Sequence, residues 1–263
     1  MSELNLTKNG ENNMTKKIYE WAKSFAGCDG GNIKAKVWLC GIEWGYSGTS
    51  EEDKSKYYKE ELEKEIKSGA VNLEDIKDSY NWTDHNQYRY GKSFAKLYSS
   101  YKGKKVEDFK DNIKLFKDDE IFKLNLYPIS FHSVDETLWE KYNLNKSTGF
   151  SSKYLFNTWC FFNRFPEFSK LREKHNPKLI VCTGINYLND FMMFFGATDH
   201  VNQGQITGKS DVNQYPRTYY WVKISSETTM VVIPFLSGRY GLNSNDLLQK
   251  MGVAIKSIMD ATA

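Results

Sequence analysis

The chain has 263 residues, of which 40% are hydrophobic and 26% charged, and its net charge is +3. This composition is typical of a folded globular protein and argues against intrinsic disorder. No apolar run approaches membrane-spanning length, and the polar start MSELNLTKNGENN lacks the apolar core of a secretory signal. We therefore expect a cytoplasmic protein with no membrane partner. Residues 1–13 are expected to be a disordered lead-in, and residues 14–263 to form a single domain.

In chain order, the apolar periodicity predicts alternating helices and strands. The expected helices cover 15–26, 51–67, 91–101, 151–165, 185–195 and 244–260, and the expected buried strands cover 36–41, 122–127, 179–183 and 230–235. The charged helix 51–67 is expected to be a solvated surface helix, and helix 151–165 places Leu155, Trp159 and Phe162 on one face. The alternating stretch 219–224 predicts an antiparallel strand or hairpin.

The four buried strands are continuously apolar rather than alternating, which indicates burial on both faces. Helices lie between them in the sequence. The predicted fold class is therefore α/β, a three-layer α/β/α sandwich with a central, mostly parallel four-stranded sheet.

Four cysteines stand at positions whose spacing matches no zinc motif: Cys28, Cys40, Cys160 and Cys182. Cys40 and Cys182 lie within predicted strands, where a cysteine is usually a small buried hydrophobic residue. We expect free thiols, no metal and no cofactor.

The first buried strand ends in a glycine-flanked turn, Gly41-Ile42-Glu43-Trp44-Gly45, that holds one carboxylate. Glutamate is a poor turn former and is costly to bury alone, so Glu43 is a candidate functional residue. Its alternative role is that of a surface turn residue in a salt bridge. In a sheet of this kind, ligands bind beyond the carboxyl ends of the strands.

The other strand ends carry further candidates. Asn125, in the segment LNLYP, offers a hydrogen-bond donor and an acceptor together, or it merely caps a turn before Pro128. The late loop after the last strand contains Ser237, Gly238 and Arg239, which suit contact with a phosphate or form a simple lead-in to the last helix. His85 and Asp84 are weaker candidates.

In this order, the four strand-end segments resemble the motifs of the uracil-DNA glycosylase superfamily. Gly41–Gly45 is similar to the turn that positions the attacking water, Asn125 to the asparagine that reads the base, Pro177–Gly184 to the penultimate strand, and Pro234–Arg239 to the late loop. The chain departs from the pattern at two places. Glu43 and Trp44 replace the usual asparagine or aspartate and proline, and the late loop has no histidine, which puts excision of plain uracil in doubt.

The resemblance implies roles for individual residues. It implies that Glu43 and Asn125 are catalytic, and that the late-loop residues Ser237, Gly238, Arg239 and Tyr240 bind DNA. The flipped base would be held by Gly41, Ile42, Trp44, Tyr46, Tyr90 and His132, with His132 the candidate to replace the missing histidine. The expected partner is DNA, double- or single-stranded.

The expected activity is that of a monofunctional DNA glycosylase. It would hydrolyse the N-glycosidic bond of a flipped, modified pyrimidine, such as a hypermodified base of phage DNA, in antiviral defence. Three alternatives stay open: a uracil-repair glycosylase, a catalytically silent DNA-binding module on the same fold, and a small-molecule α/β enzyme acting on nucleosides.

Overall fold

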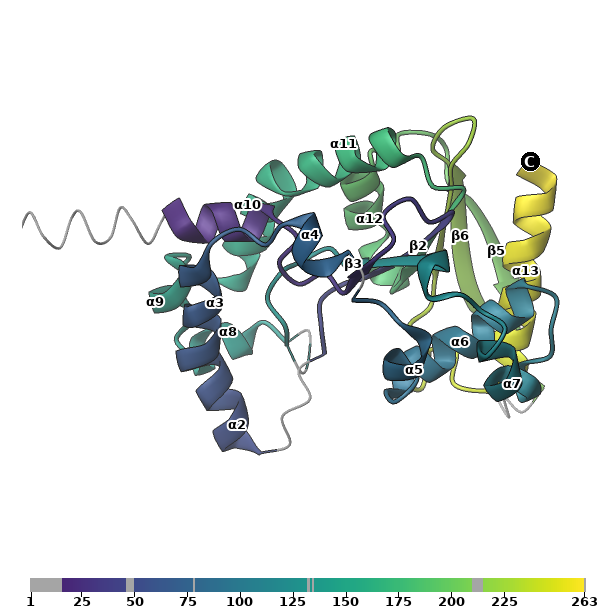
Figure 1. The fold of residues 1–263 in the computed structure, drawn as a ribbon, viewed down its shortest axis with the longest axis horizontal. Coiled ribbons are helices and arrows are strands. Elements are labelled where there is room, and N and C mark those ends of the chain that lie inside the picture. The colour runs from purple at the N-terminus through teal and green to yellow at the C-terminus, as the bar shows by residue number, and fades with distance from the viewer. Residues whose placement is uncertain are drawn as a thin grey trace, which may run out of the picture.

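The computed structural model describes residues 16–45, 50–77, 79–131, 133, 135–209 and 215–262. The expected lead-in over 1–13 lies outside these ranges. The described chain forms an α/β fold around a seven-stranded sheet with the strand order β1-β3-β2-β4-β7-β6-β5 (Figure 1). The strands are β1 Gly30–Gly31, β2 Val37–Gly41, β3 Ile121–Asn125, β4 Leu179–Thr183, β5 Asn202–Ile206, β6 Arg217–Lys223 and β7 Thr229–Ile233.

The predicted parallel core is confirmed, and the predicted strand number is wrong. Strands β3, β2, β4 and β7 lie side by side and pair in parallel. Three further strands pair antiparallel, which makes the sheet mixed. The hairpin of β5 and β6 confirms the antiparallel strand expected over 219–224. The sequence pattern missed β1 because two glycines carry no strand signal.

Helices occupy the segments between the strands. They are α2 Glu51–Lys56, α3 Leu62–Ser68, α4 Leu73–Ile76, α5 Trp82–His85, α6 Arg89–Tyr101, α7 Phe109–Ile113, α8 Thr137–Lys141, α9 Leu144–Thr148, α10 Lys153–Asn163, α11 Phe165–His175, α12 Leu188–Phe195 and α13 Asn245–Thr262. A helix over 16–23 precedes them. A π-helical segment, Tyr57–Glu61, joins α2 to α3, and single 3₁₀ turns cover Val106–Asp108, Asp118–Glu120 and Ile185–Tyr187.

Both faces of the parallel core are buried, because successive side chains of a strand point to opposite faces. On β2, Trp38 and Cys40 pack into one hydrophobic cluster, while Val37 and Leu39 pack into the other. Helices α10, α11 and α12 supply residues to the first cluster, and α6 and α13 supply residues to the second (Figure 1). The sheet therefore lies between two helical layers, as the continuous apolarity of its strands predicts.

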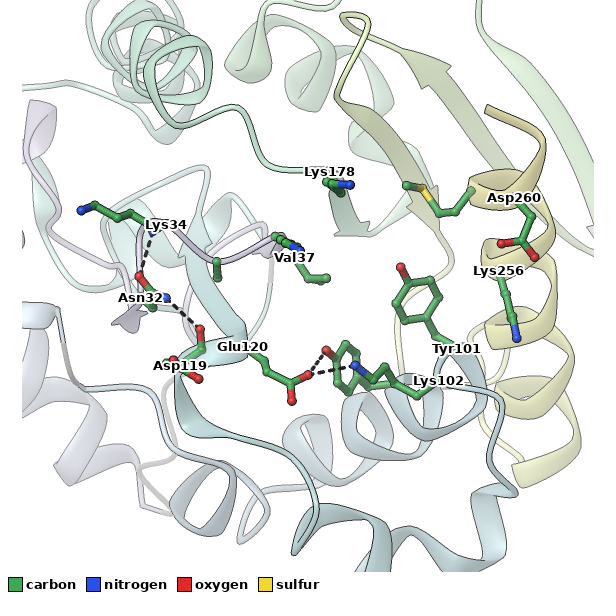
Figure 2. A pocket seen from close by; sticks show the side chains of 14 residues that line it. Asn32, Lys34, Val37, Tyr101, Lys102, Asp119, Glu120, Lys178, Lys256 and Asp260 are labelled. Atoms are coloured by element: carbon green, nitrogen blue, oxygen red, sulfur yellow. Dashed lines mark hydrogen bonds and ion pairs between the residues drawn. The ribbon is translucent and has the colours of Figure 1, made fainter. Parts of the chain in front are cut away.

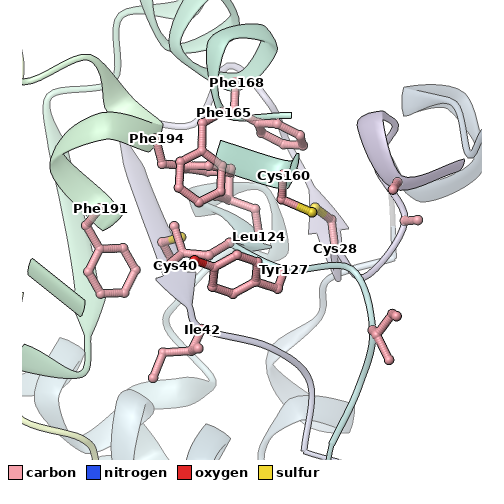
Figure 3. Packing of buried hydrophobic residues seen from close by; sticks show 14 of the residues in the cluster. Cys28, Cys40, Ile42, Leu124, Tyr127, Cys160, Phe165, Phe168, Phe191 and Phe194 are labelled. Carbon is pink, nitrogen blue, oxygen red and sulfur yellow. The ribbon is translucent and has the colours of Figure 1, made fainter. Parts of the chain in front are cut away.

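The first cluster combines aromatic rings with thiols (Figure 3). Cys28, Cys40, Cys160 and Cys182 are all free and buried. This confirms the prediction that Cys40 and Cys182 serve as small buried hydrophobic residues. Burial also raises the pKa of the Cys28 and Cys40 thiols, so they stay protonated at neutral pH.

Two helix predictions need correction. The segment expected to be a solvated helix over 51–67 buries one face, formed by Tyr57, Tyr58, Leu62 and Ile66. The π-helical turn rotates this face toward the first cluster and interrupts the regular periodicity on which the prediction rests.

The helix expected over 151–165 ends at Asn163, and a new helix starts at Phe165 because Pro166 occupies its first turn. Two of the three residues on its predicted apolar face point outward, since Leu155 and Phe162 are 47% and 71% exposed, while Trp159 is partly buried against the first cluster. Phe156 and Cys160 are the residues that face the core.

Candidate functional site

A cavity of about 430 Å³ lies at the carboxyl edge of the parallel strands. We call it the carboxyl-edge cavity. Its lining residues come from the ends of β2, β3 and β7, the start of α6, and the segments around β1, α3, α5 and the loop after β3: Asp29, Gly41, Ile42, Glu43, Trp44, Gly45, Tyr57, Glu65, His85, Tyr88, Tyr90, Gly91, Lys123, Asn125, Ser130 and Phe235. The predicted catalytic pair, Glu43 and Asn125, therefore faces one cavity. Four predicted base-binding residues, Gly41, Ile42, Trp44 and Tyr90, line it too.

Backbone pairing fixes the loop that carries Glu43. Beyond the strands, backbone amides of the segment after β3 continue to donate hydrogen bonds to backbone carbonyls at the end of β2 and after it. The amides of Leu126, Tyr127 and Phe131 donate to the carbonyls of Gly41, Ile42 and Trp44 at 3.1, 2.9 and 3.0 Å. A parallel bridge between Gly45 and Phe131 closes this extension. Glu43 thus sits on a hydrogen-bonded framework, which holds a side chain more firmly than a free loop does.

The Glu43 carboxylate is buried and paired with a buried lysine from α10. Lys153 Nζ donates to Glu43 Oε1 at 3.2 Å and lies 3.1 Å from Oε2. The two side chains are only 6% and 4% exposed, and the lysine ammonium also lies 4.0 Å from the centre of the Phe131 ring. Burial raises the pKa of Glu43 to about 7, and the attraction of Lys153 limits the rise.

The two Glu43 oxygens are not equivalent. Oε1 accepts the hydrogen bond from Lys153, whereas Oε2 is buried and makes no hydrogen bond within the described part of the chain. The geometry of Lys153 to Oε2 is that of an ion pair without a directed hydrogen bond. A carboxylate with a pKa near neutrality can accept a proton from a bound water.

Two features fix the side chain of Asn125 at the end of β3: a hydrogen bond donated by its side-chain amide, and a glycine at the paired position of β2. Its Nδ2 donates to the carbonyl of Gly27 at 2.6 Å, and the side chain is almost completely buried. Gly41 is the register partner of Asn125, and a Cβ on Gly41 would clash with Asn125 Oδ1. A glycine is therefore needed at this position so that the carboxamide can lie over the strand end.

A buried arginine ties the Asn125 strand to the neighbouring loop. Arg164, fully buried between α10 and α11, donates to the carbonyls of Leu126, Ala22 and Ala26 at 2.9, 2.8 and 3.0 Å. It also donates to the carbonyl of Asn125 itself at 3.3 Å. One guanidinium thus fixes both the asparagine and the segment that carries its acceptor, Gly27.

A second charged group forms the wall beyond Asn125. Asp29 Oδ2 accepts a hydrogen bond from Trp44 Nε1 at 2.8 Å and forms an ion pair with Lys123 Nζ, also at 2.8 Å. His85 Nδ1 lies 3.9 Å from Asp29 Oδ1, and burial together with Lys123 lowers the pKa of His85, so the imidazole is neutral at pH 7. The side chains of Asp29, Lys123 and His85 are 13%, 11% and 17% exposed.

Aromatic side chains form the rest of the wall. The Tyr90 hydroxyl lies 2.9 Å from Thr183 Oγ1 at the end of β4, and burial raises the pKa of Tyr90. The ring of Phe235, the first aromatic residue after β7, lies 5.8 Å from the Tyr90 ring. Tyr88 is 63% exposed at the cavity. The sequence offers Tyr88 and Tyr90 as candidates to stack on a base, and both line the cavity, whereas Phe235 is an addition.

The four predicted DNA-binding residues do not line the cavity. Ser237, Gly238, Arg239 and Tyr240 belong to the loop that begins with Phe235, and the last three are exposed. Buried Arg217 braces this loop by donating to the carbonyls of Gly241 and Arg239 at 3.0 and 3.3 Å. The predicted base-binding residues Tyr46 and His132 lie outside the described residues.

A larger cavity, of about 590 Å³, lies at the opposite edge of the parallel strands (Figure 2). Its carboxylate Glu120 already accepts from Tyr98 at 2.5 Å and lies 3.3 Å from Lys102. The lysines that surround it are mostly exposed. We therefore place the candidate functional site in the carboxyl-edge cavity, where the Glu43 carboxylate is buried.

Within the described ranges, no group of three or more His, Cys, Asp or Glu side chains is placed to hold a metal ion. Among the same residues, no helix is long and apolar enough to cross a membrane. Comparisons of the chain with models of protein families, with curated proteins and with solved structures found no match.

Proposed function

We propose that this protein is a DNA glycosylase that hydrolyses the N-glycosidic bond of a flipped, modified pyrimidine and leaves an abasic site. The observation that carries the proposal is the meeting of a buried carboxylate, Glu43, and a buried carboxamide, Asn125, in one cavity at the carboxyl edge of the sheet. This edge is where α/β folds bind their ligands, and perturbed acids in cavities mark functional sites.

The chemistry follows from the two side chains. Departure of the base leaves a cationic, oxocarbenium-like sugar, which an ionised Glu43 stabilises. A water molecule then forms a bond from its oxygen to the anomeric carbon, and Glu43 takes the released proton. The electron pair of the broken C–N bond leaves with the base. Asn125 holds the base through Oδ1 and the N–H that Gly27 does not use.

The size of the cavity favours a substituted base. A volume of about 430 Å³ falls in the range of sites that enclose ligands larger than one bare ring. The loop of exposed Arg239 and Tyr240 begins at the cavity wall, and it can contact the DNA backbone while the base is flipped. A hypermodified pyrimidine of phage DNA fits both features and would place the enzyme in antiviral defence.

A panel of duplex and single-stranded oligonucleotides tests the proposal. Each carries uracil, thymine, cytosine or a 5-substituted pyrimidine, and abasic sites are detected by alkaline cleavage. The proposal predicts abasic product from a substituted pyrimidine and none from the same DNA with Glu43→Gln. Preference for uracil would favour the repair alternative. DNA binding without abasic product from any substrate would favour the silent binding module.

A further inference from the structure

The chemistry of glycosidic cleavage is favoured by a positive charge on the far side of the departing base. The electron pair of the broken bond enters the pyrimidine ring and spreads onto its carbonyl oxygens, so a cation beside the ring lowers the barrier. Lys153 does not line the cavity and lies against Glu43, at the sugar end. Among the lining residues that the structure describes, Lys123 is the one with an amine or guanidinium group.

The strand register places Lys123 in line with the proposed catalytic pair. Lys123 and Asn125 are two residues apart on β3 and therefore point to the same face, about 7 Å apart. Gly41 is the register partner of Asn125, and Glu43 lies two residues farther along the chain. The order along the cavity is thus Glu43, Asn125, Lys123. A base held by Asn125 with its sugar at Glu43 directs its distal edge toward Lys123.

The surroundings of Lys123 keep its ammonium in this position. Asp29 lies 2.8 Å from it, and the ammonium lies 5.2 Å from the centre of the Tyr90 ring. The same Asp29 oxygen also accepts from the Trp44 indole. The indole hydrogen bond fixes the orientation of the Asp29 carboxylate and thereby the position of the Lys123 ammonium. A largely desolvated ion pair on a cavity wall is costly to maintain, which favours a functional role.

We propose that Lys123 is a catalytic residue that stabilises the negative charge of the departing base. The inference rests on the proposed glycosylase function. In the step it assigns, the sugar–base bond breaks, the electron pair moves to the base, and the Lys123 ammonium binds the distal carbonyl oxygen of the resulting anion. Solvent water protonates the base after release.

The test is a series of oligonucleotides whose target pyrimidines differ in the electron-withdrawing power of the 5-substituent. Single-turnover excision rates are measured for the wild type and for Lys123→Met. Loss of Lys123 is expected to slow excision about 100-fold for the poorest leaving group. The loss should be smaller for the best leaving group, so the dependence of rate on leaving-group acidity becomes steeper.

Two further variants separate catalysis from folding. Lys123→Met leaves Asp29 buried without its cation, so the double variant Asp29→Asn, Lys123→Met restores charge balance and is expected to fold like the wild type while staying slow. Lys102→Met is the matched control, because Lys102 also pairs with a carboxylate at 3.3 Å and lies 5.7 Å from a tyrosine ring centre, outside the carboxyl-edge cavity. Its rates should equal those of the wild type.

The outcomes distinguish this inference from the proposed function. A wild type that excises a base, with Lys123 variants within twofold of it or equally slowed for every leaving group, would overturn the role of Lys123 and leave the glycosylase proposal standing. A wild type that excises no base from any oligonucleotide would overturn both.

Discussion

Lys153 Nζ lies 3.2 Å from Glu43 Oε1 and 3.1 Å from Glu43 Oε2, although the two residues are 110 positions apart in the chain. Both side chains are nearly inaccessible to solvent. Burial alone would favour a neutral Glu43, and the ammonium brings the pKa of its carboxyl back to about 7. The pair therefore sets the pH at which a carboxylate becomes available in the cavity.

The first prediction concerns the pH dependence of excision. The ionised form of Glu43 is the proposed base, so the rate should rise with pH, with a midpoint of about 7, and level off above it. Lys153→Met removes the group that lowers this pKa, so the midpoint should move to higher pH. Single-turnover rates between pH 5 and 9 measure the shift. An unchanged midpoint would show that Lys153 does not lower the pKa of the group that controls the rate.

The second prediction concerns the glycine under Asn125. In Gly41→Ala the added Cβ would clash with Asn125 Oδ1, so the carboxamide must move. We expect the free energy of unfolding to fall by about 1–3 kcal/mol and excision to weaken. Urea unfolding measures the first effect. Gly45→Ala is the matched control for stability, since a Cβ at Gly45 would meet no atom of the described residues within 4 Å. Its free energy of unfolding should differ from that of the wild type by less than about 0.5 kcal/mol.

The third prediction concerns the buried guanidinium of Arg164. Arg164→Met leaves the carbonyls of Leu126, Ala22 and Ala26 without their donor. Each buried polar group without a partner costs about 1–3 kcal/mol, so the variant should lose about 3 kcal/mol or more of unfolding free energy. Denaturant unfolding monitored by fluorescence measures this loss. A loss below about 1 kcal/mol would show that the carbonyls find other partners.

The fourth prediction concerns the late loop. If Arg239 contacts a phosphate, Arg239→Gln should weaken DNA binding to the same degree for every sequence and reduce the slope of log K against log salt by about 1. Fluorescence anisotropy at several salt concentrations measures both. Lys256→Gln provides the control, because Lys256 lines the cavity at the opposite edge of the sheet. Equal salt slopes for the two variants would show that Arg239 contacts no phosphate and that the loop is not part of the DNA interface.

The parts of the site that could be predicted are those set by local sequence. Gly41 and Asn125 end apolar strands and Glu43 follows one, and parallel strands bring their carboxyl ends to one edge. The meeting of Glu43 and Asn125 in one cavity is the outcome that this rule predicts. Tyr90 also lies at the cavity, as the sequence predicts.

The parts that could not be predicted depend on contacts between distant segments. Lys153 belongs to a helix whose apolar residues suggested a different buried face, and only the packed fold brings it to Glu43. Asp29 and Lys123 lie 94 positions apart by their residue numbers and pair because β1 adds to the edge of the sheet beside β3. No local pattern marks such residues, because a charged side chain in a helix or strand is usually exposed to solvent.

The most direct measurement of the central claim compares abasic-site formation by the wild type and by Glu43→Gln on DNA that carries a 5-substituted pyrimidine. The account predicts a rate at least about 1,000-fold lower for the variant, with DNA affinity within a few-fold of the wild type. Equal rates of abasic-site formation by the two proteins would contradict it.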